Sequence, residues 1–341
     1  MRYFTYILFL IFPIISVVIQ GCGNEPDKSN AEVVFRLALQ PDPENKVWVA
    51  ADTFKRELEH RSDGRIRVMF YDSAVLGAER QLLESCYFGI IEMVQVTSSV
   101  VTTIDPLFSI LDMPYLFFDE AHHQKALNGP IGQELLDDLN KVRFQGLAFY
   151  SCGFRHIFNS KRPVYSPDDM KGLKIRVMES PVMLRSINCM GGSATPLSAS
   201  ELYSALKTGV VDGAENNPRV FISAHFCDAC KFLSLTGHFV NQHVLIANKS
   251  WLESLKPEYR QMIRDTAKDI LPEYNRAWNA SVEEAMAQMK KQGVTVNDVT
   301  GKKAFVGSVQ PIYDEYANVV PPELVRRIRK EAEDDHLLPD N

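Results

Sequence analysis

The sequence predicts an α/β protein with mostly parallel sheets, because segments with strand and helix periodicity alternate along its 341 residues. The opening shows this alternation, with an apolar strand at Val33–Leu39, an amphipathic helix at residues 45–61 and a second strand at residues 65–70. The composition, 45% hydrophobic and 23% charged residues, is that of a globular protein, and the length suffices for two domains.

The same alternation continues through the first half of the chain. Apolar residues at helical spacing predict helices, and short apolar runs between polar turns predict strands. The helices are expected near residues 79–88, 119–127 and 131–139, and the strands at residues 92–96, 144–150 and 155–160.

Capping signals place the elements of the middle third. Ser166 precedes a proline and two aspartates, which is typical of a helix start with a serine cap and acids at the positive helix end. Ser198 and Glu201 have the spacing of a capping box and open a helix that ends before a glycine. Strands at residues 173–177 and 210–212 flank this segment, which predicts a parallel crossover.

The last quarter of the chain is predicted to be helical. Residues 257–292 have helical periodicity, but Pro272 should kink or break the helix because it lacks an N–H donor. A final helix is expected at Pro322–Glu333.

The N-terminus predicts export. Arg2 is the only charge before Glu25, and residues 3–19 are almost entirely apolar, as in a signal peptide. The residues Ile-Gln-Gly before Cys22 resemble a bacterial lipobox, which predicts removal of residues 1–21 and a lipid on Cys22. The alternative is an uncleaved anchor helix, since the apolar stretch is nearly long enough to span a bilayer. Either way, we expect the folded part in the periplasm or at the cell surface, attached to a membrane.

Charge and cysteine content exclude other classes of protein. The formal net charge is −6 and no basic stripe is present, so nucleic acid is not an expected partner. Apart from Cys22, the cysteines have irregular spacing and an odd count, unlike a disulfide framework. Cys227 and Cys230 form a C-x-x-C at a predicted helix end, whereas a thioredoxin-like redox motif sits at a helix start. We interpret both thiols as incidental.

No motif for catalysis stands out. The adjacent residues His122 and His123 lie in a predicted surface helix, without partner cysteines or the H-E-x-x-H spacing of a zinc site. The G-x-S-x-G motif of many hydrolases is absent from the sequence. We therefore expect no enzyme, no metal and no other cofactor.

Two arginines suggest an anion site. Arg176 ends an otherwise apolar strand, Arg155 lies near the start of another, and Asn216 and Asn217 follow the strand predicted at residues 210–212. A guanidinium matches a carboxylate with two parallel hydrogen bonds, and two arginines in one crevice would need an anion. The alternative is that each arginine pairs with a nearby Asp or Glu on the surface.

The region that holds these residues resembles a known family. Gly-Leu-Lys-Ile-Arg-Val at residues 172–177 and Thr-Gly-Val-Val-Asp-Gly-Ala-Glu-Asn-Asn-Pro at residues 208–218 are similar to the solute-binding proteins of tripartite ATP-independent periplasmic (TRAP) transporters, the DctP-type family. Gly-Phe-Arg-His-Ile-Phe-Asn-Ser at residues 153–160 and Leu-Gly-Ala-Glu-Arg at residues 76–80 match as well. The similarity covers nearly all of the chain after the export signal.

The resemblance implies a hinged, two-domain fold of the type II periplasmic binding protein class. In this family, crossing strands join two α/β domains, a long C-terminal helix spans both, and the domains close on the ligand. Pro272 is expected within that helix. The implied division is a signal peptide at 1–21, a flexible tether at 22–31, domain I at 32–152 plus 242–281, and domain II at 153–241 plus 282–341.

The resemblance also implies the ligand contacts. Arg176 matches the arginine that makes a bidentate salt bridge to the ligand carboxylate, while Arg155 and Asn216 match residues that hold the same group. Ala199 stands where some relatives press an aromatic side chain on the ligand. Further contacts, which vary among relatives, are expected from Gln40, Glu79, Thr97, Glu179 and His243.

Two of these further contacts have plain alternatives. Glu79 could be a solvated surface acid, and His243 could be a core histidine whose hydrogen bonds are satisfied within the protein. If Glu79 and Glu179 do face the ligand, their carboxylates accept hydrogen bonds and cannot donate them. They would therefore favour a polyhydroxylated acid, such as a hexuronate or an aldonate, over a C4-dicarboxylate.

The implied partners are a small organic acid and the TRAP permease subunits in the membrane. The function expected from the resemblance is capture of that acid and its delivery to the permease. The alternatives are a C4-dicarboxylate binder and a sensory binding protein that presents its ligand to a receptor.

Overall fold

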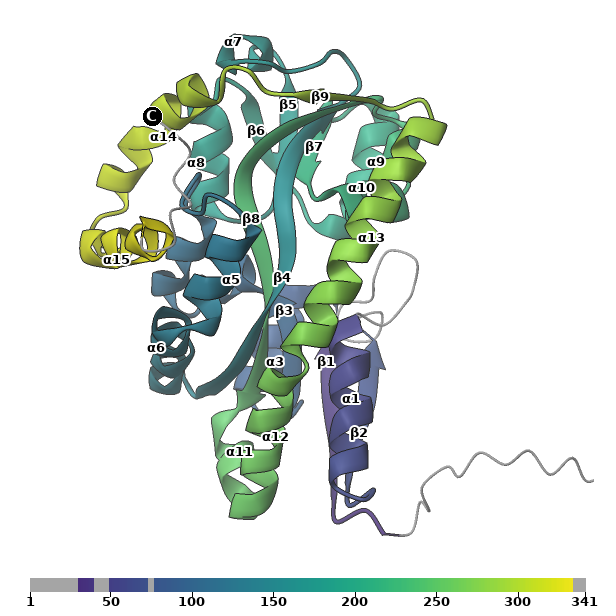
Figure 1. Cartoon of the computed structure of the whole chain (residues 1–341), viewed down its shortest axis with the longest axis vertical. Coiled ribbons are helices and arrows are strands. Elements are labelled where there is room, and N and C mark those ends of the chain that lie inside the picture. Colours follow the sequence, from purple (N-terminus) through teal and green to yellow (C-terminus); the bar gives the residue numbers. More distant parts are fainter. Residues whose placement is uncertain (1–29, 40–48, 73–76, 334–341) are drawn as a thin grey trace, which may run out of the picture.

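The computed structural model describes residues 30–39, 49–72 and 77–333. Within them, nine strands form one sheet that runs through the whole molecule (Figure 1). The predicted export signal, the predicted tether up to residue 29, Cys22 and Gln40 lie outside the described residues.

The strand order divides the sheet into two ends joined by two long strands. The order is β2 (Ile66–Asp72), β1 (Val33–Leu39), β3 (Met93–Thr97), β8 (Phe232–Asn248), β4 (Phe144–Asn159), β7 (Gly213–Asn216), β5 (Lys174–Val177) and β6 (Ser193–Pro196), with β9 (Thr295–Asp298) paired to β8. We call the part around β2, β1 and β3 lobe I, and the part around β7, β5 and β6 lobe II. Most of the strand pairings are parallel, as expected. The exceptions involve the two long strands: β8 is antiparallel to β3 and β4, and β4 is antiparallel to β7.

The strands predicted at residues 144–150 and 155–160 are one strand, β4. Two features hid this continuity: the register with β8 shifts between Ser151 and Phe154, and Gly153 between them has φ +69°. Such a bulge interrupts the two-residue periodicity without ending the strand.

The partner of β4 was not predicted at all. β8 contains the buried polar residues His238, Asn241, Gln242 and His243, so its middle lacks the apolar pattern of a core strand.

The strand predicted at residues 210–212 lies slightly further along, as β7 (Gly213–Asn216). Val210 is 56% exposed and precedes the strand. A Cβ on Gly213 would lie 2.1 Å from the carbonyl oxygen of Phe158, so only glycine allows β7 to approach β4 this closely.

Helices cover both faces of the sheet (Figure 1). In and beside lobe I they are α1 (Val49–Arg61), α3 (Glu79–Tyr87), α4 (Ser98–Val101), η1 (Pro106–Asp112), α5 (Glu120–Asn128), α6 (Pro130–Asp138), η2 (Leu139–Val142), α11 (Lys249–Ser254) and α12 (Pro257–Asp269). In lobe II they are α7 (Pro167–Met170), α8 (Pro181–Cys189), α9 (Ala199–Thr208), α10 (Pro218–Ser223), η3 (Phe226–Asp228) and α14 (Lys302–Glu315). The last helix is α15 (Pro322–Glu333).

The helix α13 (Leu271–Lys291) is the long C-terminal helix that spans both lobes (Figure 1). Tyr274 and Trp278 in its first half belong to a core cluster of lobe I, whereas Ala285 and Met289 belong to a cluster of lobe II. The predicted break occurs just before it: α12 ends before Ile270 and Pro272 lies in the first turn of α13, where its missing N–H costs nothing.

The helix with His122 and His123, α5, has an exposed face as predicted, but both histidines lie on its buried face. Both residues are buried, because α15 packs against α5 and residues of β8 lie on its other side (Figure 1). His122 Nε2 lies 2.7 Å from the carbonyl oxygen of Ile328, and His123 Nε2 lies 3.0 Å from Oε1 of Gln242.

The five described cysteines, Cys86, Cys152, Cys189, Cys227 and Cys230, are all thiols. The first cysteine of the C-x-x-C lies in η3, and both are buried. The thiol of Cys227 donates to Oε1 of Gln292 over 2.7 Å, so it packs against the end of α13.

Candidate functional site

A cavity of about 420 Å³ lies between the lobes, within the size range of small-molecule sites. Lobe I contributes the start of α3 and the α4 segment, and lobe II contributes the end of β5 and the start of α9. The lining residues are Gly77, Ala78, Glu79, Arg80, Ser99, Val100 and Thr103 on one side, and Arg176, Met178, Glu179, Leu197, Ser198, Ala199 and Ser200 on the other. The predicted ligand residues Arg176, Glu79 and Glu179 thus share one cavity.

Arg176 presents unused hydrogen-bond donors to this cavity. Its Nε donates to the carbonyl oxygen of Leu197 over 2.9 Å, which fixes the guanidinium, while neither Nη has a hydrogen-bond partner among the described residues. The side chain is only 2% exposed. Burial lowers the pKa of Arg176 to about 10, so the group stays charged at neutral pH. A buried cation with a free fork of donors is suited to a carboxylate.

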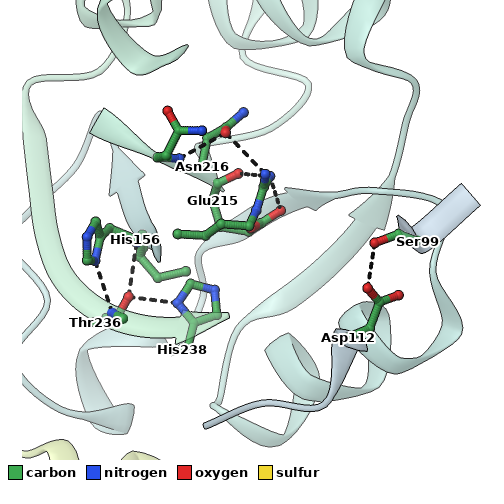
Figure 2. Close-up of polar contacts among 11 residues, drawn as sticks. Ser99, Asp112, His156, Glu215, Asn216, Thr236 and His238 are labelled. Carbon is green, nitrogen blue, oxygen red and sulfur yellow. Dashed lines mark hydrogen bonds and ion pairs between the residues drawn. The ribbon is translucent and has the colours of Figure 1, made fainter. Parts of the chain in front are cut away.

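Arg155, by contrast, already has an internal anion. Its Nε and Nη2 donate to the two carboxylate oxygens of Glu215, Nη2 at 2.9 Å, and Nη2 also reaches the carbonyl oxygen of Glu215 at 2.8 Å (Figure 2). Both side chains are buried. The expectation that both arginines need an external anion is therefore wrong for Arg155, and its partner lies in the core rather than on the surface.

The remaining donors near Arg155 point to a shared role with Asn216. Nη1 of Arg155 donates to Oδ1 of Asn216 over 3.1 Å, and that oxygen also accepts the N–H of Asn217 over 2.9 Å (Figure 2). The amide oxygen is thus fully used, and the amide NH2 of Asn216 has no partner among the described residues. The Asn216 side chain is therefore fixed as a donor, whereas Asn217 caps α10 by accepting from Val220 N.

Sequence reasoning missed Glu215. It is the only charged residue of β7 and is fully buried, and β7 pairs with β4 so that Ile157 faces Glu215, placing the carboxylate beside Arg155. The available signal was a single acid, Glu215, between small residues of one strand, and a single arginine, Arg155, in another strand. The 60 residues that separate the two concealed it.

Glu79 is not a solvated surface acid. The residue is half-buried at the start of α3, and its Oε1 accepts from the N–H and the hydroxyl of Thr97 at 3.1 and 3.0 Å. Oε2 has no hydrogen-bond partner among the described residues. Burial raises the pKa of Glu79 above its ordinary value, against the hydrogen bonds from Thr97 and the charges of Arg176 and Arg155.

The other predicted contacts divide by position. Thr97 is buried and its hydroxyl is committed to Glu79, so it orients that carboxylate. Glu179 is exposed and lies on the cavity wall. Ala199 at the start of α9 lies on the same wall.

His243 is a core histidine, as the alternative interpretation held. It is buried, its Nδ1 lies 3.0 Å from Nε2 of Gln95, and it is not among the residues that line the cavity. Burial, with a smaller contribution from the charge of Arg219, lowers the pKa of His243 to about 4, so the ring is neutral at neutral pH.

A second polar network lies beside the arginine pair and was also missed. Thr236 Oγ1 accepts from the N–H of Ile157 at 3.2 Å and lies 2.8 Å from Nδ1 of His238, while the N–H of Gly237 donates to Nδ1 of His156 at 3.0 Å (Figure 2). Burial lowers the pKa of His156 to about 4 and that of His238 well below its ordinary value. Where β4 and β8 shift register, the ring of His156 accepts from the N–H of Gly237 and the ring of His238 contacts the hydroxyl of Thr236.

Neither a metal cluster nor a spanning helix is found in the part of the chain that the structure describes. Residues 30–39, 49–72 and 77–333 contain no group of three or more His, Cys, Asp or Glu side chains arranged to hold a metal ion. Across the same residues, every helix is too short or too polar to cross a bilayer.

Comparison with known proteins identifies the family. Residues 40–319 match the bacterial extracellular solute-binding proteins, family 7. The chain belongs to this family. Proteins of family 7 bind solutes outside the cell. One solved relative, from Chromohalobacter salexigens, is a TRAP periplasmic solute-binding protein. The chain is therefore a TRAP solute-binding protein that acts outside the cytoplasm. The family is one of transport proteins.

Individual relatives agree with this membership. A solute-binding protein of Verminephrobacter eiseniae is 36% identical over 88% of this chain and 89% of its own length. The 2,3-diketo-L-gulonate-binding periplasmic protein of Escherichia coli is 29% identical over 94% of this chain and 95% of its own length. The crystal structure of a TRAP periplasmic solute-binding protein from Chromohalobacter salexigens with bound D-glucuronate has a TM-score of 0.82 at 31% identity, covering 87% of this chain and 99% of that one.

The buried ion pair predicts a strong stability effect. Glu215→Ala leaves the guanidinium of Arg155 buried without its anion, and we expect the free energy of unfolding to fall by about 3–5 kcal/mol, measured by urea denaturation. The double variant Arg155→Met, Glu215→Leu should recover a large part of this loss, since it leaves no unpaired charge. Asp168→Ala, which removes an exposed partner of Lys171, is the control and should have little effect. Equal stability of Glu215→Ala and Asp168→Ala would contradict the role given to the pair.

Proposed function

We propose that this TRAP solute-binding protein captures a sugar acid, a hexuronate or an aldonate, and delivers it to the membrane permease subunits. One observation carries the proposal: the free Nη donors of Arg176 open into the same cavity as the carboxylates of Glu79 and Glu179. One end of that cavity offers donors for a carboxylate, and other parts offer acceptors for hydroxyl groups.

In this proposal the carboxylate of the solute pairs with both Nη groups of Arg176. Arg155 and Asn216 are not among the residues that line this cavity; we propose that the amide NH2 of Asn216 and the remaining N–H of Arg155 Nη1 supply further donors once the solute is bound. Glu215 then has a clear purpose, since it keeps Arg155 in place without occupying Arg176.

The rest of the solute faces carboxylates. Oε2 of Glu79 and the carboxylate of Glu179 can accept hydroxyl hydrogens of a sugar acid, because ionised carboxylates only accept. The second carboxylate of a C4-dicarboxylate would meet like charge there, which is unfavourable, above all beside the half-buried Glu79. The bound D-glucuronate of the Chromohalobacter salexigens protein and the diketogulonate named for the Escherichia coli protein support the same choice.

The proposal extends to residues outside the described part of the chain and to residues beside the cavity. We propose that residues 1–21 are an export signal, that Cys22 carries a lipid and that Gln40 contributes to the solute site. We also propose that Thr97 and His243 act from behind the cavity wall and that the chain catalyses no reaction. The proposed domain boundaries lie at residues 152/153, 241/242 and 281/282.

The alternative function is sensory, with the ligand presented to a receptor. Vesicles that contain the permease should take up the solute only when this protein is present if its role is transport, and not if its role is sensory.

The choice of solute is tested by calorimetry on residues 23–341. We expect the protein to bind at least one of D-glucuronate, D-galacturonate and D-gluconate, because each has one carboxylate for Arg176 and several hydroxyls for Glu79 and Glu179. Malate and succinate are the comparison. Binding of the dicarboxylates alone would overturn the proposed solute class.

Arg176 should dominate affinity. Arg176→Ala removes both Nη donors, and the affinity for the bound sugar acid should fall by at least about 30-fold, because the solute carboxylate is left buried and unpaired. Arg185→Ala, which removes a surface ion pair with Glu315, is the matched control and should bind as the unchanged protein does. Calorimetry measures both; retained affinity in Arg176→Ala would show that another group holds the carboxylate.

Glu79 should determine the preference for hydroxyls. In Glu79→Gln the side-chain oxygen can still accept from Thr97, so the fold is kept, but an amide NH2 replaces the acceptor at Oε2. We expect roughly tenfold weaker binding of the sugar acid and a smaller preference over malate, both measured by calorimetry. An unchanged preference would place the hydroxyl-binding group elsewhere.

A further inference from the structure

Asp112, at the end of η1, connects the two lobes through a buried pair of hydrogen bonds. Its Oδ1 accepts from the hydroxyl of Ser99 over 2.5 Å (Figure 2) and its Oδ2 from the hydroxyl of Ser180 over 2.6 Å. Ser99 belongs to α4 in lobe I, whereas Ser180 caps α8 in lobe II. All three residues are buried, with exposed fractions of 3% or less. We call them the Ser99–Asp112–Ser180 clasp.

Both serines adjoin the walls of the solute cavity. Ser99 lines it on the lobe I side, and Ser180 directly follows Met178 and Glu179, which line it on the lobe II side. The clasp therefore connects two opposite walls through Asp112 and Ser180, neither of which lines the cavity.

The surroundings of Asp112 favour its role as a double acceptor. Ser180 is the N-cap of α8, accepting from the N–H of Met183 over 3.4 Å, so the positive end of that helix faces the carboxylate. The charge of Arg155 on β4 is also favourable, whereas Glu215 on β7 is unfavourable; Tyr316 follows α14 nearby. Burial raises the pKa of Asp112 to about 6, and the two serine hydroxyls oppose that rise.

The strength of the contact follows from its chemistry. A hydroxyl that donates to a buried carboxylate forms a charge-assisted bond, about twice as strong as a neutral one. When lobe II moves away from lobe I, the Ser180 bond must break and Asp112 loses one of its two donors. A contact of this kind favours the arrangement in which the cavity walls are close.

We propose that Asp112 is a positioning residue that holds the lobes together around the solute and slows its release. This inference rests on the proposed function for its solute, but not for the contact between the lobes. It differs from a local structural role, because it predicts a change in solute release rather than in the stability of one helix.

The test is Ser180→Ala in residues 23–341, with D-glucuronate as the probe and stopped-flow fluorescence as the measurement. The dissociation rate should rise roughly tenfold, because the clasp favours the arrangement in which the cavity walls are close. Ser180→Thr keeps a hydroxyl and a helix cap, and should restore slow release. Ser166→Ala is the matched control: it also removes a serine cap in lobe II, but that serine bonds only within its own capping box, to Asp169.

A second variant, Asp112→Asn, tests the inference independently in case Ser180→Ala fails to fold. Asp112→Asn can accept from one serine and donate to the other, so it keeps the shape of the clasp without the charge, and it should raise the dissociation rate by roughly threefold. Equal dissociation rates in Ser180→Ala, Asp112→Asn and Ser166→Ala would overturn the inference.

A final measurement separates this inference from the proposed function. If the unchanged protein binds none of the acids tested, the proposed solute is wrong, but the effect of the clasp on the distance between the lobes can still be measured without solute. Small-angle X-ray scattering should then give a larger radius of gyration for Ser180→Ala than for Ser166→Ala. Identical radii would refute the clasp whatever the solute is.

Discussion

The pairing of β4 with β8 is the constraint on which the rest of the structure depends. The two strands pair from Phe144 to Asn159 and carry the sheet from lobe I into lobe II, so they set how the walls of the cavity face each other. Their register shifts midway, where Gly153 and Gly237 have φ of +69° and +55°. Bulges and positive-φ glycines allow a strong local bend without loss of the pairing, which is what a hinge between two lobes requires.

The two arginines show how a buried cation can be made available to a ligand. Arg155 is held by Glu215 and acts together with Asn216, while Arg176 is held only through Nε and keeps its terminal donors. Glu215 is hydrogen-bonded to Arg155 and acts on Arg176 through its charge alone, so the terminal donors of Arg176 stay available in the cavity. In the proposed function, the carboxylate of the solute pairs with these donors, and the half-buried Glu79 supplies an acceptor for a hydroxyl group.

Much of the local structure could be predicted from the sequence. Periodicity and capping chemistry act within a few residues, and they predict the opening elements from β1 to β3 and the helices α5 and α6. They also predict the caps at Ser166 and Ser198 and the break near Pro272. The failures share one cause. The polar middle of β8, the continuity of β4 and the burial of His122 all depend on neighbours far away in sequence, whose presence no local pattern reports.

The sequence by itself determined where most helices begin and end and, through the residues around Arg176 and Asn216, to which family the chain belongs. Only the tertiary structure decided which arginine keeps terminal donors without a partner among the described residues. Arg155 and Arg176 look alike as isolated residues of apolar strands, but Glu215 on β7 is hydrogen-bonded to Arg155 and not to Arg176. The structure likewise decided that Glu79 faces the cavity whereas His243 lies in the core. The physical reason is that the state of a buried polar group depends on the partners that folding brings to it, and those partners come from strands and helices tens of residues away.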